Sequence, residues 1–124
     1  MPEILLIDDM KGVRRAVSSV LKGRGHVLTE ADDGSKGIEL LRSGKKFDLV
    51  ITDVLMPECD GTEVIMFLDT MPNRPPILAI SGGGNQVSPD SALMVARSKA
   101  DAVLAKPFEN ADLIATVDRL LQKH

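Results

Sequence analysis

Five polar residues stand out because each directly follows a short apolar segment. Asp8 and Asp9 end EILLIDD, Asp53 ends FDLVITD, Ser81 ends PILAIS, and Lys106 ends AVLAK. Carboxylates that gather together repel one another unless a cation neutralises them. Oxygen ligands without histidine or cysteine suit Mg²⁺, whereas a lysine amine and a serine hydroxyl suit phosphate oxygens. We therefore interpret these positions as one candidate site for Mg²⁺ and a phosphoryl group.

The chemistry available to such a site is phosphoryl transfer. A carboxylate can act as the nucleophile and form an aspartyl phosphate, while a metal ion and a lysine neutralise the charge on the transferring group. Each residue also has a plainer interpretation when taken alone. Asp8 or Asp9 could cap a helix, Ser81 could be an ordinary serine at the end of a strand, and Lys106 could be a solvated lysine.

Short apolar segments alternate with helical stretches along the chain. We expect strands over residues 3–8, 26–31, 47–53, 76–81 and 102–106. We expect helices ending at Gly23, over 35–42, after Gly61, over 91–99 and over 110–123. This strict alternation predicts an α/β fold whose parallel sheet is covered on both faces. Ligands of such sheets bind beyond the carboxyl ends of the strands, where the five polar residues are expected to lie.

Composition narrows the class of protein. The chain has 124 residues, the size of one domain, and a net charge of -3, which does not suggest a nucleic-acid surface. Its apolar stretches are shorter than the ~20 residues that span a bilayer. Cys59 is the only cysteine, which excludes an internal disulfide and fits a reducing compartment such as the cytoplasm. Only two histidines, His26 and His124, are present, too few for a structural zinc site.

The acid pair, the motifs DLVITDVLMPECDG and KPF, and the serine that closes the fourth strand resemble the receiver domain of two-component response regulators, over essentially the whole length. The resemblance implies a flavodoxin-like, doubly wound, five-stranded parallel sheet in the order 2-1-3-4-5. It implies that residues 1–124 form one receiver domain. It also implies that Asp53 accepts a phosphoryl group from a histidine kinase or a histidine phosphotransfer protein.

The same resemblance assigns roles to the other residues of the site. Mg²⁺ would bind Asp8, Asp9, Asp53 and the backbone carbonyl of Leu55. Ser81 and Lys106 would bind the phosphoryl group, and the Lys106–Pro107 peptide bond would be cis. The phosphodonor would dock on the first helix, where Arg14 and Arg15 are expected to be exposed.

The chain departs from the family pattern at several positions. Val103 stands three residues before the lysine, where receiver domains usually have tyrosine or phenylalanine, and this puts the usual aromatic switch in doubt. Met10 follows the acid pair, where a polar residue is common. Leu55 and Gly83 occupy the two positions thought to tune hydrolysis, and neither side chain can orient a water molecule.

We interpret the chain as a phosphorylatable switch or phosphorelay shuttle with an unknown downstream protein target. We expect it to catalyse only its own phosphorylation and dephosphorylation, without contact with nucleic acid or membrane. One alternative is a receiver domain excised from a longer response regulator or hybrid kinase. Another is a Mg²⁺-dependent phosphohydrolase that uses Asp53, although such enzymes usually carry an acid where Leu55 stands. A flavodoxin-like cofactor binder would share the fold, but the chain has no tryptophan or tyrosine to stack on a flavin.

Overall fold

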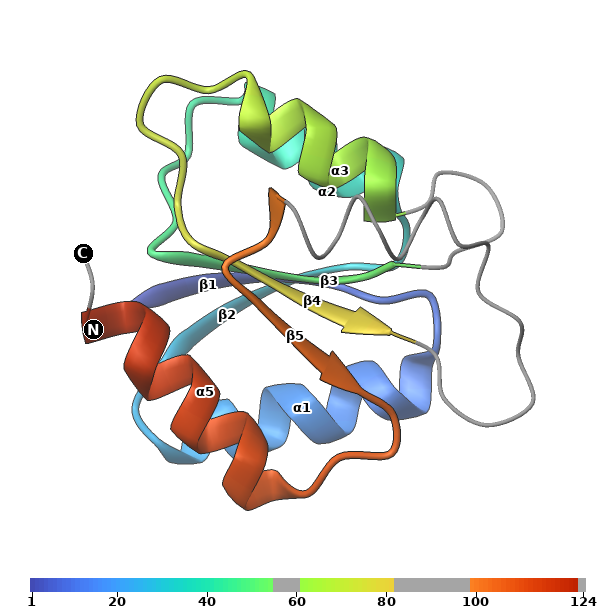
Figure 1. Cartoon of the computed structure of the whole chain (residues 1–124), viewed down its shortest axis with the longest axis vertical. Helices are drawn as coiled ribbons and strands as arrows, with labels where there is room; N and C mark the ends of the chain where they lie inside the picture. Colours follow the sequence, from blue (N-terminus) through green and yellow to red (C-terminus); the bar gives the residue numbers. More distant parts are fainter. Residues whose placement is uncertain (55–60, 82–98, 123–124) are drawn as a thin grey trace.

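A computed structural model of the chain shows one parallel sheet between two layers of helices (Figure 1). It describes residues 1–54, 61–81 and 99–122. The strands are β1 (Glu3–Ile7), β2 (Val27–Ala31), β3 (Leu49–Asp53), β4 (Ile77–Ser81) and β5 (Ala102–Ala105). The helices are α1 (Lys11–Gly23), α2 (Gly34–Arg42), α3 (Gly61–Asp69) and α5 (Asn110–Gln122). The helix expected over 91–99 lies almost wholly outside the described residues.

The strand order is β2-β1-β3-β4-β5, which confirms the predicted order 2-1-3-4-5. All neighbouring strands are parallel, so their carboxyl ends meet at one edge of the sheet. The register aligns these ends closely: Ile7 of β1 lies opposite Thr52 of β3, and Asp53 lies opposite Ile80 of β4. The topology therefore brings segments far apart in sequence to one place.

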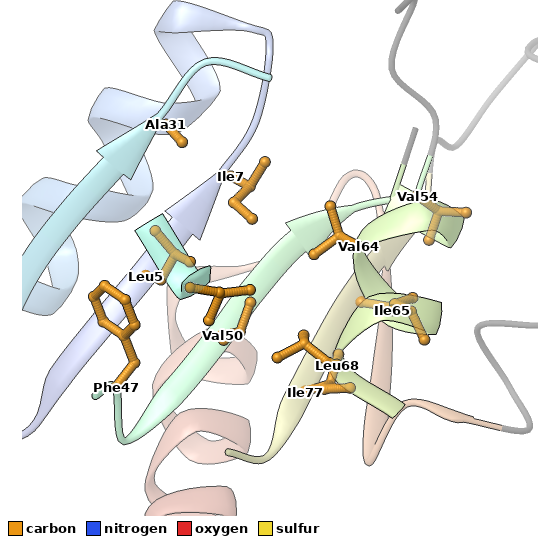
Figure 2. Packing of buried hydrophobic residues seen from close by; sticks show 12 residues of the cluster. Leu5, Ile7, Ala31, Phe47, Val50, Val54, Val64, Ile65, Leu68 and Ile77 are labelled. Carbon is orange, nitrogen blue, oxygen red and sulfur yellow. The ribbon is translucent and has the colours of Figure 1, made fainter. Parts of the chain in front are cut away.

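The central strands bury both faces, and alternate residues serve different layers. Ile4 and Leu6 pack with residues of α1 and α5, whereas Leu5 and Ile7 belong to the cluster formed with α2 and α3. This alternation follows from the two-residue period of a strand. Figure 1 shows α1 and α5 on one face and α2 and α3 on the other. Figure 2 shows the cluster on the α2 and α3 side, where strand residues meet apolar side chains of α3.

The strand boundaries differ from the sequence-based expectation by one or two residues. β1 ends at Ile7 and β5 at Ala105, so Asp8 and Lys106 lie just beyond the strands that we expected to include them. The Asp8 N–H still donates to the Ala31 carbonyl of β2, whereas the Asp8 carbonyl accepts a hydrogen bond from the Arg14 side chain. Among the described residues, none of the helices combines the length and the hydrophobicity needed to span a membrane.

Candidate functional site

Three carboxylates converge at the carboxyl ends of β1 and β3. Asp8, Asp9 and Asp53 each offer an oxygen atom, and these atoms lie within 4.8 Å of one another. Asp8 and Asp53 are almost completely buried, with 1% and 4% of their surface exposed, whereas Asp9 is half-buried. The structure therefore brings the three predicted acids into one cluster, because β1 and β3 are neighbours in the sheet.

The amine of Lys106 lies between two of these carboxylates. Its Nζ is 2.9 Å from Asp53 Oδ2 and 3.6 Å from Asp8 Oδ2. The backbone of Lys106 is held next to β4, since the Lys106 N–H donates to the Ser81 carbonyl over 3.0 Å. The peptide bond between Lys106 and Pro107 is cis, as predicted. A lysine from the far end of the chain thus supplies a positive charge directly to the acid cluster.

The surroundings of Asp8 and Lys106 raise the pKa of both side chains. Burial raises the pKa of Asp8, and the charges of Asp53 and Asp9 add to that rise. The hydrogen bond from the Met10 N–H and the charge of Lys106 oppose it without cancelling it. Burial alone would lower the pKa of Lys106, but its hydrogen bond to Asp53 and its charge interactions with Asp53 and Asp8 outweigh burial and raise that pKa. Lys106 therefore does not fully offset the cost of burying the Asp8 carboxylate.

The carboxylate oxygens of the cluster are suitable ligands for Mg²⁺. Asp8 Oδ1 accepts a hydrogen bond from the Met10 N–H over 2.9 Å, but the buried Oδ2 accepts none from any residue that the structure describes. A buried carboxylate oxygen is costly unless a donor or a cation satisfies it. Three carboxylates offer the hard oxygen ligands that Mg²⁺ prefers. Leu55, the fourth predicted ligand, lies outside the described residues.

Ser81 and Val103 occupy the neighbouring strands. Ser81 is the last residue of β4, so it lies at the same edge of the sheet as Asp53. Only 9% of its surface is exposed. Val103 is half-buried on β5 and packs against the apolar cluster of the α2 and α3 face. No aromatic ring stands at that position, in agreement with the sequence. Gly83, like Leu55, lies outside the described residues, so the expectation that neither side chain orients a water molecule stays a prediction.

Arg14 was wrongly expected to be exposed, whereas docking of the phosphodonor on the first helix stays a prediction. Its side chain is only 15% exposed, and it binds the Asp8 carbonyl and the Glu30 carboxylate. Arg15 is exposed, as expected. The sequence offers no local signal for the contact with Glu30, because the two residues meet only when β2 lies beside β1.

Comparison with known proteins identifies a consistent group of relatives. A family model described as the response regulator receiver domain matches residues 4–118. The response regulator receiver protein CpdR of Brucella abortus is 32% identical over 123 residues, with 98% of each chain covered. The transcriptional regulatory protein CusR of Escherichia coli is 30% identical and covers 98% of this chain, but this chain spans only 52% of CusR. This chain spans 14% of the similar Probable histidine kinase 3 of Oryza sativa.

Solved structures agree with this grouping. The receiver domain of the Francisella response regulator 1452 has a TM-score of 0.84 at 25% identity, and 99% of this chain and 98% of that chain are covered. The signal receiver domain of a signal transduction histidine kinase from Syntrophus aciditrophicus has a TM-score of 0.85 at 26% identity, with 99% and 92% covered. Similar domains thus occur both in response regulators and within a histidine kinase.

Proposed function

The chain belongs to the response regulator receiver domain family, and from that premise we propose that it is a phosphorylatable signalling switch or phosphorelay shuttle. In this proposal Asp53 accepts a phosphoryl group from a histidine kinase or a histidine phosphotransfer protein in a Mg²⁺-dependent reaction. The observation that supports it best is the Lys106 amine, which lies 2.9 Å from Asp53 within the cluster of acids. Phosphorylation then changes the binding of a downstream protein.

The proposed reaction is a displacement at phosphorus. A carboxylate oxygen of Asp53 attacks the phosphorus of a phosphohistidine, the new O–P bond forms, and the P–N bond breaks with its electron pair going to the histidine nitrogen. Lys106 and Ser81 bind the oxygens of the transferred group. Asp8, Asp9, Asp53 and the backbone carbonyl of Leu55 would hold Mg²⁺, which when bound supplies positive charge opposite the phosphoryl oxygens.

In this proposal the chain does not turn over a separate substrate. Asp53 is consumed when it becomes an aspartyl phosphate, so the chain catalyses only its own phosphorylation and dephosphorylation. If the phosphodonor protein obtains its phosphate from ATP, the reaction would take place in the cytoplasm.

The assignment of Asp53 is tested with a small phosphodonor. Incubation with acetyl phosphate and Mg²⁺ should add one phosphoryl group per chain, and Asp53→Asn should abolish this addition because the amide is not a nucleophile. Intact-protein mass spectrometry measures the product directly. The control is Asp32→Asn, which neutralises an exposed acid at the end of β2 and should label like the parent. Undiminished labelling of Asp53→Asn would refute the assignment.

A further inference from the structure

The Arg14 guanidinium joins three segments that meet beside the acid cluster. Its Nη1 donates to the Asp8 carbonyl over 2.8 Å, and its Nε donates to Glu30 Oε1 over 3.2 Å. Asp8 lies at the end of β1, Glu30 lies near the end of β2, and Arg14 itself lies in the first turn of α1. The guanidinium therefore ties the start of the helix to the ends of two strands.

These contacts complete the anchoring of Asp8. The Asp8 N–H donates to the carbonyl of Ala31, the residue after Glu30, over 3.1 Å. Its carbonyl is held by Arg14, and its Oδ1 is held by the Met10 N–H. Oδ2 accepts no hydrogen bond from the part of the chain that the structure describes, and the Lys106 amine lies 3.6 Å from it. Without the guanidinium, the turn that carries Asp8, Asp9 and Met10 would keep the bond from the Asp8 N–H to Ala31 but lose the link from the Asp8 carbonyl through Arg14 to Glu30 of β2.

We propose that Arg14 is a positioning residue: it holds the turn containing Asp8 and Asp9 against β2 and thereby sets the affinity of the acid cluster for Mg²⁺. This inference rests on the proposed function, because it takes the acid cluster to be the Mg²⁺ site. Partners that orient the ligands of a metal strongly affect its binding. A guanidinium is suited to the role because its planar donors reach two acceptors at once, which a lysine amine on a flexible stem does not reproduce.

The test must separate the loss of the anchor from the loss of charge. Removing Arg14 alone would leave Glu30 uncompensated, and the added negative potential would itself favour Mg²⁺. The double variant Arg14→Gln with Glu30→Gln removes one positive and one negative charge, so the net charge is unchanged. We expect its Kd for Mg²⁺ to be about tenfold weaker than that of the parent, the low end for residues that orient metal ligands. Chemical shifts of backbone amides in a Mg²⁺ titration measure this Kd on the folded protein.

Two further variants serve as controls. Arg15→Gln removes an exposed arginine charge one residue along α1, and its Kd should stay within about twofold of the parent at physiological salt, where exposed charges are screened. Arg14→Lys keeps the charge but not the two-acceptor geometry, so its Kd should also weaken. If the double variant does not fold, Arg14→Lys carries the test.

Each outcome is distinct. A Kd of the folded double variant within about twofold of the parent overturns the inference, and so does a parent-like Kd of Arg14→Lys where only that variant folds. A lower free energy of unfolding with an unchanged Kd would show a purely structural role and also overturns it. The inference is also overturned if the Kd is unchanged but phosphoryl transfer from a protein donor is lost at saturating Mg²⁺. That result would make Arg14 a docking residue. A parent protein that binds no Mg²⁺ would refute the proposed function itself.

Discussion

Asp8 is a buried carboxylate whose charge the fold only partly compensates. It receives one hydrogen bond at Oδ1 from the Met10 N–H, and Lys106 approaches its Oδ2 to 3.6 Å. Asp53 and Asp9 lie within the same cluster and repel it. Burial is the largest cause of its raised pKa. Such a residue favours the binding of a cation, but it lowers the free energy of unfolding of the metal-free protein.

The raised pKa makes a prediction about stability. In the unfolded chain Asp8 ionises near its ordinary value of 3.8, but in the folded protein it ionises at higher pH. The unfolded state therefore loses the proton first, and stability falls as pH rises from the unfolded pKa to the folded pKa. At neutral pH without metal, Asp8→Asn should raise the free energy of unfolding, because the uncharged amide avoids the cost of burying a carboxylate beside two other acids. Urea unfolding in EDTA measures this.

The pH dependence provides an internal check on this variant. Below the unfolded pKa both states of the parent are protonated at Asp8, so the advantage of Asp8→Asn should disappear there. Asp118→Asn is a suitable control because it removes an exposed carboxylate that pairs with Arg24, and such pairs contribute little. A variant Asp8→Asn that is less stable than the parent at pH 7 would contradict this account of the site.

At the level of elements, α2 packs closely against β1 at Gly37. Gly37 is buried in the middle of this helix, and a Cβ atom at that position would overlap the Ile7 side chain, with Cγ1 2.9 Å away. Asp33 caps the helix, since its side chain accepts a hydrogen bond from the Lys36 N–H over 2.8 Å. The glycine, which weakens the helix by its own propensity, is therefore needed for close packing on the sheet.

This packing predicts opposite effects for two similar substitutions. Gly37→Ala should destabilise the protein by about 1–3 kcal/mol, because the added methyl group overpacks a buried contact. Gly12→Ala in α1 is the matched control: a Cβ there has nothing within 4 Å, and the change should be neutral or stabilising by up to about 1 kcal/mol. Urea unfolding of both variants tests the difference.

A second substitution can identify the clash as the cause. Ile7→Val removes the terminal methyl group that a Cβ at position 37 would meet. Combined with Gly37→Ala, it should cost less than the sum of the two single changes, because valine lacks the Cδ1 atom that makes the shorter of the two close contacts. Strict additivity of the two changes would show that the destabilisation has another source.

At the level of the whole molecule, the apolar residues of the sheet form the core, and the charged residues lie at the edge where the strands end. Two apolar clusters, one on each face, are built from alternate residues of the same strands. The polar residues Asp8, Asp53 and Lys106 lie outside both clusters, at or just beyond the carboxyl ends of β1, β3 and β5. Because several strands contribute to the site, a ligand that binds there should stabilise the folded chain as a unit.

The stability of the whole chain should therefore respond to Mg²⁺. An ion that binds only the folded site stabilises it by RT ln(1 + [Mg²⁺]/Kd), about 1.4 kcal/mol at ten times Kd. The Tm should rise with Mg²⁺ concentration in thermal unfolding followed by circular dichroism. KCl at equal ionic strength controls for general screening of the net charge of -3. An equal rise in KCl would mean that no specific site is filled.

Local patterns in the chain were enough to predict much of this protein. Apolar runs and helical spacing predicted the strands and the described helices to within a few residues, because each pattern depends on neighbours in sequence. The position of Asp53, Ser81 and Lys106 at or just beyond the strand ends followed in the same way. The strand order did not follow from the alternation itself; it came from the resemblance to receiver domains, which the structure confirms.

Contacts between distant residues required the folded structure. The anchor from Arg14 to Glu30 exists because β2 lies beside β1, and the close approach of Gly37 to Ile7 exists because α2 lies against that strand. The pairing of Lys106 with Asp53 joins residues 53 positions apart. Such contacts depend on which strands are neighbours and on how far each side chain reaches, and neither property is encoded in a local pattern.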